Sequence, residues 1–94
     1  MREPCVYILT NFERTVLYTG VTANLPRRLE QHAEGVGSRF VRQYKTRVLV
    51  YVEFFPTMIE AIEHEKRIKS WKRTKKVALI EESNPEWRDL TAEE

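Results

Sequence analysis

The sequence predicts a small α+β domain in which a three-stranded antiparallel sheet is flanked by about three helices. Short runs of β-forming residues lie near the N-terminus, a longer run lies in the middle, and segments with helical periodicity follow. The 94 residues suffice for one hydrophobic core and leave little room for a second. We therefore expect residues 1–94 to form a single domain.

The strands are predicted from β-forming residues and from what separates them. Cys5–Leu9 and Val16–Gly20 are joined by the polar residues 10–15, which indicates a β-hairpin. Arg47–Phe55 is the third and longest candidate, and Pro56 ends it. Cys5 is the single cysteine, and we expect it to be a small buried side chain.

The first predicted helix begins after Asn24, a good N-cap residue, and carries Pro26 in its first turn. Gly35 and Gly37 are expected to end it. Residues 38–46 then read as a polar connection.

Two further helices are predicted after the third strand. Thr57 and Glu60 form a capping-box pattern, so a helix is expected from Met58 to about Lys72. Thr74 is expected to cap a last helix from Lys75 to about Glu82.

Charge is distributed unevenly along the chain. Residues 1–80 carry fifteen Lys and Arg against eight Asp and Glu, a net +7, whereas residues 81–94 carry one Arg against six acids, a net −5. A basic body favours a polyanionic partner. Residues 83–94 are expected to be an acidic tail that Trp87 and Leu90 dock onto the body.

The sequence indicates a protein that neither spans a membrane nor is exported. The longest apolar run is Val48–Val52, whereas a membrane span needs about 20 apolar residues. The N-terminus has no apolar signal segment, and a lone cysteine suits a reducing compartment. We expect a cytoplasmic protein.

Glu65 has an unusual place in its predicted helix. Around it, one apolar stripe is formed by Met58, Ala61, Ile62 and Ile68. A carboxylate there loses hydration and requires a cation or hydrogen bonds. The two interpretations, about equally favoured, are an ion pair with Lys69 one turn later and a ligand for Mg²⁺.

Two further pairs could carry chemistry. Arg28 and His32 are four residues apart, so they share a helix face and could address one phosphate, although such pairs are more often solvated. Tyr7 and Tyr18 occupy comparable positions on the two arms of the hairpin, and their rings could emerge from one sheet face. A phenol beside an arginine and a metal could act as a general base.

These residues resemble the GIY-YIG nuclease superfamily, specifically its small stand-alone bacterial members. Val6-Tyr7-Ile8 and Tyr18-Thr19-Gly20 are similar to the two signature motifs, with Val6 in place of glycine and Thr19 in place of isoleucine. The resemblance implies that Arg28 is catalytic, that His32 occupies an active-site position and that Glu65 is the metal-binding glutamate. Asn84 is a loose candidate for an asparagine often found in the family.

The activity that this resemblance implies is metal-dependent hydrolysis of DNA phosphodiester bonds. Glu65 would hold one ion of Mg²⁺ or Mn²⁺, Tyr18 or Tyr7 assisted by His32 would take a proton from water, and Arg28 would offset the developing charge. There are two alternatives. One is a nucleic-acid-binding module on the same scaffold that does not cut, or a subunit that a partner delivers. The other is a protein-interaction adaptor. We expect a monomer or a weak dimer.

The DNA backbone is expected to be guided by basic side chains on either side of this site. These are Arg27, Arg39, Arg42, Lys45, Lys69, Lys72 and Arg73. Phe40 or Tyr44 could stack on a base, with core packing an equally favoured interpretation for both aromatic side chains.

Overall fold

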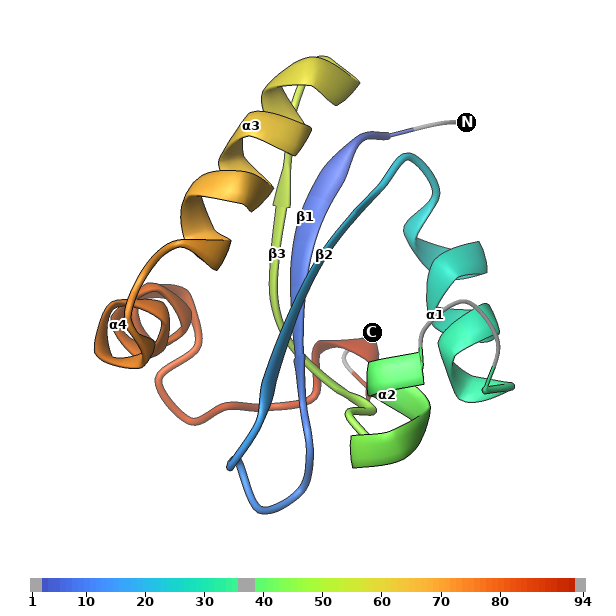
Figure 1. Ribbon diagram of the computed structural model, residues 1–94, viewed down its shortest axis with the longest axis vertical. Helices are drawn as coiled ribbons and strands as arrows, with labels where there is room; N and C mark the ends of the chain where they lie inside the picture. The colour runs from blue at the N-terminus through green and yellow to red at the C-terminus, as the bar shows by residue number, and fades with distance from the viewer. Residues whose placement is uncertain (1–2, 36–38, 93–94) are drawn as a thin grey trace.

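Figure 1 shows the computed structural model, which describes residues 3–35 and 39–92. In chain order these residues form β1 (Cys5–Thr10), β2 (Leu17–Thr22), α1 (Leu25–Ala33), α2 (Arg39–Tyr44), β3 (Val48–Phe54), α3 (Met58–Lys69), α4 (Arg73–Ser83) and the 3-10 turn η1 (Leu90–Ala92). The predicted α+β class is confirmed. Some of the sequence expectations lie outside the described residues. These are the helix end at Gly37, the start of the connection at Ser38, and the end of the tail at Glu93 and Glu94.

The three strands form one antiparallel sheet in the order β2-β1-β3. The hairpin pairs Tyr7 with Gly20 and Leu9 with Tyr18, so both tyrosines lie on the same face of the sheet. The register between β1 and β3 shifts after Ile8. Every residue of β1 is buried, as a central strand covered on both faces requires.

The helices α3 and α1 lie on opposite sides of the sheet (Figure 1). Each face has its own hydrophobic cluster, and β1 contributes alternate residues to the two clusters. The α3-side core consists of Val6, Ile8, Val50, Tyr51, Ala61, Ile68, Ile80 and Trp87. The α1-side core consists of Tyr7, Leu9, Val41 and Leu49, with Leu25 and Leu29 of α1 packed against it. Cys5 is fully buried, as predicted.

Two predicted helix starts are confirmed. The side chain of Asn24 accepts a hydrogen bond from the Arg27 amide at 3.2 Å and so caps α1. The Thr57 hydroxyl accepts from the Glu60 amide at 3.2 Å and donates to the Glu60 carboxylate at 2.9 Å, which fixes the start of α3.

Three details of the helices differ from the sequence expectations. The supposed connection over residues 38–46 contains α2, which the buried Val41 anchors to the α1-side core. α3 ends at Lys69, because the next residue, Ser70, caps it and donates its hydroxyl to the Arg67 carbonyl at 2.7 Å. α4 begins at Arg73 rather than after Thr74, and its N-cap residue makes no side-chain cap.

The position of Arg73 accounts for the earlier start of α4. Its guanidinium donates to the carbonyl of Arg14 at 2.6 Å and to that of Thr15 at 3.2 Å, which ties the first turn of α4 to the hairpin loop. Tertiary hydrogen bonds therefore override the local capping preference.

The segment after α4 packs onto the sheet. The Asn84 amide donates to the Val50 carbonyl at 3.1 Å and to the Arg88 carbonyl at 2.9 Å, so this asparagine joins the tail to β3. Trp87 is 8% exposed within the α3-side core, and Leu90 packs against the α1-side core. No helix within the described residues is long and apolar enough to cross a membrane.

Candidate active site

Tyr7 reaches the site because its cross-strand partner has no side chain. A Cβ atom on Gly20 would lie 2.5 Å from both the Cζ and Oη atoms of Tyr7, closer than real contacts allow. The glycine of the second motif therefore leaves the space that the ring of the first motif occupies.

The Tyr7 hydroxyl forms a buried hydrogen bond of 2.8 Å with Nε2 of His32, which α1 presents. Burial raises the pKa of Tyr7 to about 12, and a hydrogen bond from Arg28 offsets part of this rise. Tyr7 is consequently protonated at neutral pH.

Tyr7 has two hydrogen-bonding neighbours. An arginine can only donate, so the Tyr7 oxygen accepts from Arg28, and the same hydroxyl group is hydrogen-bonded to Nε2 of His32. Burial, followed by the charge of Arg28, lowers the pKa of His32 and favours the neutral imidazole. Its Nδ1 atom is buried without a hydrogen-bond partner within the described residues.

Arg28 lies between the two tyrosines. Its hydrogen bond to Tyr7 makes the largest contribution to a raised pKa, and a hydrogen bond to Tyr18 contributes as well. On α1 its Nη1 atom also donates to the Gln31 side chain at 3.3 Å. The guanidinium is thus held by its own helix and by both phenol groups.

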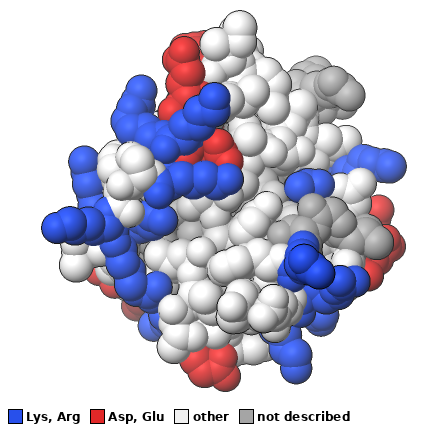
Figure 2. Space-filling model, viewed as in Figure 1, with Lys and Arg blue, Asp and Glu red and all other residues white. Residues whose placement is uncertain are grey.

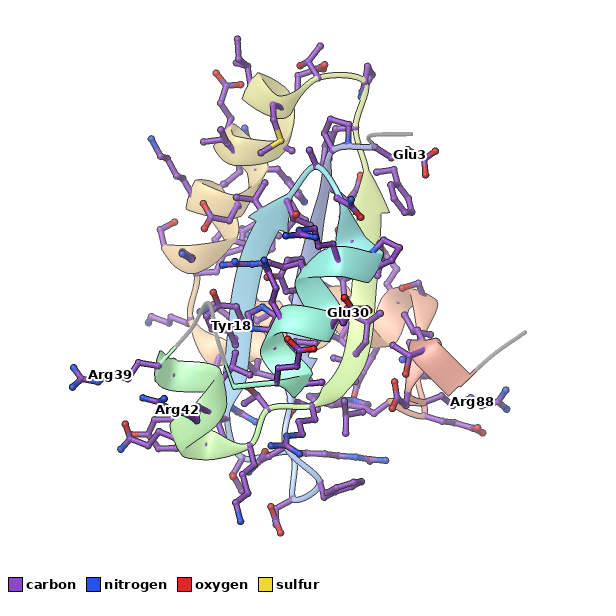
Figure 3. The ribbon with its side chains drawn as sticks, turned by 90° about the vertical axis from the view of Figure 1, so that its right-hand side faces the viewer. Glu3, Tyr18, Glu30, Arg39, Arg42 and Arg88 are labelled. Carbon is purple, nitrogen blue, oxygen red and sulfur yellow. The ribbon has the colours of Figure 1, made fainter. Side chains whose placement is uncertain are left out.

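Tyr18 completes the cluster from β2, where Figure 3 shows it beside α1. Its ring centroid lies 6.3 Å from that of Tyr7, 5.6 Å from that of His32 and 5.7 Å from that of Phe40. Tyr18 is half-buried, whereas Tyr7 is fully buried. Of the two phenols, Tyr18 is the more accessible to a ligand.

Glu65 lies on α3, which packs against β1 and β2. It is 8% exposed among the apolar residues of this helix, and one carboxylate oxygen lies 2.6 Å from Nζ of Lys69. The ion pair with Lys69, one of the two interpretations drawn from the sequence, is present. Tyr7, Tyr18, Arg28 and His32 form a four-residue cluster joined by direct contacts, whereas Glu65 lies on α3, which packs on the other face of the sheet, and is paired with Lys69.

The donor set at Glu65 suits a metal that keeps most of its waters. Within residues 3–35 and 39–92 no three His, Cys, Asp or Glu side chains gather as a metal cage. A single buried carboxylate that already holds an ammonium group can instead hold one Mg²⁺ or Mn²⁺, with water and phosphate oxygens as the other ligands.

The predicted DNA-binding residues are all exposed and fall into two groups. Figure 2 shows Lys and Arg gathered over α3 and α4 on the left and over α1 and α2 on the right, with a less charged strip between them. In Figure 3, Arg39 and Arg42 point away from the body, whereas Arg88 lies on the other side of the molecule. Arg73 is already engaged by the hairpin loop, which leaves it less available to DNA.

Gln31 was missed from the sequence, and two contacts of the site, those of Gly20 and Phe40, depend on the fold. The spacing of three residues from Arg28 could have identified Gln31. The steric role of Gly20 requires the strand register. Phe40 makes tilted ring contacts with Tyr18 and Tyr44, with 4.7 Å between the centroids of Phe40 and Tyr44, and these contacts depend on α2.

Comparison with known proteins identifies the family. The family model described as the GIY-YIG catalytic domain matches residues 3–78. This chain belongs to the GIY-YIG family. The expected resemblance is thereby confirmed, and Glu65 and the four-residue cluster all fall within the matched region.

Relatives of this GIY-YIG chain are similarly short. A UPF0213 protein of Staphylococcus haemolyticus is 37% identical over 82 residues, which cover 87% of this chain and 99% of the relative. A UPF0213 protein of Bacillus pumilus is 42% identical over 66 residues, which cover 70% of this chain and 67% of the relative. The solution NMR structure of a UPF0213 protein from Bacillus halodurans matches with a TM-score of 0.61 at 31% identity, covering 95% of this chain and 94% of the other.

Membership places the chain among nuclease domains. GIY-YIG nucleases act on DNA and generally use a divalent metal ion.

Proposed function

We propose that this protein is an endonuclease that hydrolyses DNA phosphodiester bonds with one divalent cation. The observation that carries the proposal is the contiguous cluster of two tyrosines, one arginine and one histidine, reached by Tyr7 only because residue 20 is glycine. A non-catalytic domain has no physical need to hold a half-buried arginine between two phenols.

Tyr18 is the better candidate for the general base. It is half-buried and beside Arg28, so it can meet an incoming water molecule, whereas Tyr7 is fully buried and hydrogen-bonded to His32. In the proposed reaction Tyr18 acts as a phenolate beside Arg28: the oxygen of water attacks phosphorus, its proton passes to the phenolate oxygen to give the neutral phenol, and the bond to the leaving oxygen breaks. The leaving oxygen recovers a proton from solvent.

Tyr7 and His32 act as positioning residues in this proposal. The chain of contacts from His32 through Tyr7 to Arg28 fixes the direction of the guanidinium. Arg28 is then held where negative charge develops on the phosphate oxygens, and a preorganised cation there stabilises the transition state.

Glu65 would hold the divalent ion, Mg²⁺ or Mn²⁺. When bound, the ion polarises the scissile phosphate as a Lewis acid. The burial of Glu65 supports this role, because a carboxylate with few waters gains more from a cation than an exposed one.

The two exposed basic groups on either side of the strip in Figure 2 are suited to the DNA backbone. We propose that a monomer or a weak dimer binds DNA across this face, and that the protein acts in the cytoplasm.

Nicking of supercoiled DNA tests the function. We expect Mg²⁺ or Mn²⁺ to support nicking, and Glu65→Gln and Tyr18→Phe each to remove most of it, while Tyr44→Phe on the exposed surface of α2 retains it. Equal loss in both tyrosine variants would contradict the role of Tyr18.

A non-cutting DNA-binding module is the second candidate, because Lys69 already satisfies the charge of Glu65 without any metal. Retarded migration of DNA with no nicking in either metal would favour it over the endonuclease.

A further inference from the structure

Glu65 and Lys69 form the most closely spaced ion pair in the described part of the chain, with 2.6 Å between Nζ and Oε2. The two members differ strongly in their surroundings. The Glu65 side chain is 11% exposed and fixed among buried residues of α3, whereas the Lys69 side chain is 53% exposed at the end of the helix. The carboxylate is therefore fixed in place, and the ammonium is free to move on its flexible stem.

An ammonium group and a divalent cation compete for the same oxygens. A buried carboxylate requires one positive partner. A divalent cation that prefers oxygen ligands binds the carboxylate more strongly than an ammonium group does. If both remained, two cations would lie side by side in a poorly hydrated position, which is unfavourable. Metal binding at Glu65 must therefore release Lys69.

The released lysine is well placed for phosphate. Lys69 belongs to the basic group over α3 and α4, together with the exposed side chains of Lys66 and Lys72. Once its ammonium leaves Glu65, it adds one positive charge to a surface suited to the DNA backbone.

We propose that Lys69 is a displaceable counter-ion, which neutralises Glu65 without metal and is transferred to a DNA phosphate when a divalent cation binds. The inference deepens the proposed function and rests on its assignment of Glu65 as the metal site. It makes metal and DNA binding cooperative. A bound metal releases Lys69 for a DNA phosphate, and a phosphate that holds Lys69 leaves Glu65 open to the metal.

Metal binding without DNA tests the first half. In NMR titrations with Mg²⁺, the ammonium signal of Lys69 and the amide of Glu65 should shift together. Lys69→Met should tighten metal binding by about two- to fivefold, because the competing ion pair is gone. Lys66→Met is the matched control, since it removes the same charge from an exposed position on the same helix, and it should change the affinity little.

DNA binding tests the second half. We expect Ca²⁺ to strengthen binding of a labelled duplex to the wild-type protein at constant ionic strength, with the recovered duplex checked for cleavage. This gain should be smaller in Lys69→Met and retained in Lys66→Met.

The outcomes separate this inference from the proposed function. Equal effects of the two lysine variants on metal affinity, or weaker metal binding by Lys69→Met, would overturn the displacement. A Mg²⁺ titration that shifts neither Glu65 nor Lys69 would overturn both the displacement and the metal site. Displacement with cooperative DNA binding but no nicking would leave this inference standing and remove the endonuclease.

Discussion

The two faces of the sheet each carry a tyrosine beside a histidine, and the third member decides what the pair can do. On the α1 side, Tyr7 and His32 are joined at 2.8 Å with Arg28 beside them. On the α3 side, the Tyr51 hydroxyl donates to the Glu53 carboxylate and lies 3.4 Å from Nε2 of His64.

The charged side chain beside the tyrosine is positive in one cluster and negative in the other. Arg28 offsets part of the pKa rise that burial causes in Tyr7, whereas Glu53 adds to the rise that burial causes in Tyr51. Glu53 also lies 3.3 Å from His64, so this cluster joins β3 to α3 as an ordinary polar contact. In the proposed function Arg28 makes the α1-side cluster a site for phosphate, whereas Glu53 makes the α3-side cluster a structural link.

The largest effect is expected from removing the cation. Arg28→Met should lower the rate of DNA nicking by about 10²- to 10³-fold, because the charge that faces the phosphate is lost. Glu53→Gln, which alters the partner on the other face, should leave the rate nearly unchanged. Initial rates on supercoiled DNA, with thermal melting to verify folding, check the pair. Similar losses in both variants would refute the distinction.

Gly20→Ala should destabilise the protein by about 1–3 kcal/mol, since the added methyl group overlaps the Tyr7 ring. Urea unfolding measures the cost. In the Tyr7→Leu background the overlapping atoms are absent, so the same substitution should cost much less. An undiminished cost there would show that the strain lies elsewhere.

The hydroxyl groups of the two tyrosines are expected to differ in their contributions to stability. Tyr7→Phe leaves Nε2 of the buried His32 without its hydrogen-bond partner and should cost about 1–3 kcal/mol. Tyr51→Phe should cost less than about 1 kcal/mol, because the half-exposed Glu53 regains water. Denaturant unfolding of both variants is the measurement, and the reverse order would argue against a tightly buried Tyr7–His32 pair.

The smallest predicted effect is a pH dependence on the α1 side. Since burial and Arg28 lower the pKa of His32 below its ordinary value of 6.5, the unfolded chain binds a proton there more readily than the folded one. The free energy of unfolding should therefore decrease as the pH falls below about 6.5. In His32→Gln this part of the slope should vanish, and an unchanged slope between pH 7 and pH 5 would contradict it.

Local patterns in the sequence were enough for the hairpin, the capped starts of α1 and α3, and the shared face of the two tyrosines. Each depends on a strong short-range rule, such as alternation or capping. The short helix α2 was missed because its segment is rich in basic residues, Arg39, Arg42 and Lys45, and only one buried residue, Val41, anchors it. One buried position gives no helical periodicity in the sequence. The start of α4 depends on the hairpin loop, far away in sequence.

The candidate site was predictable to the extent that it follows helix spacing. Arg28 and His32 could be placed on one face of a helix from their separation, and both contact Tyr7. The choice between a metal and Lys69 at Glu65 could not be made, because it depends on burial and side-chain direction. The close approach of Tyr7 to Gly20 likewise requires the pairing of two strands.

The packing of the last segment has a practical consequence for fragments of this protein. The family match ends at residue 78, inside α4, whereas Ile80 and Trp87 fill one hydrophobic cluster and Leu90 packs against the other. A fragment trimmed to residues 3–78 would expose apolar surface on both sheet faces and should aggregate or be digested rapidly by proteases. The folding unit is therefore longer than the region that defines the family, and the C-terminal segment closes both of its cores.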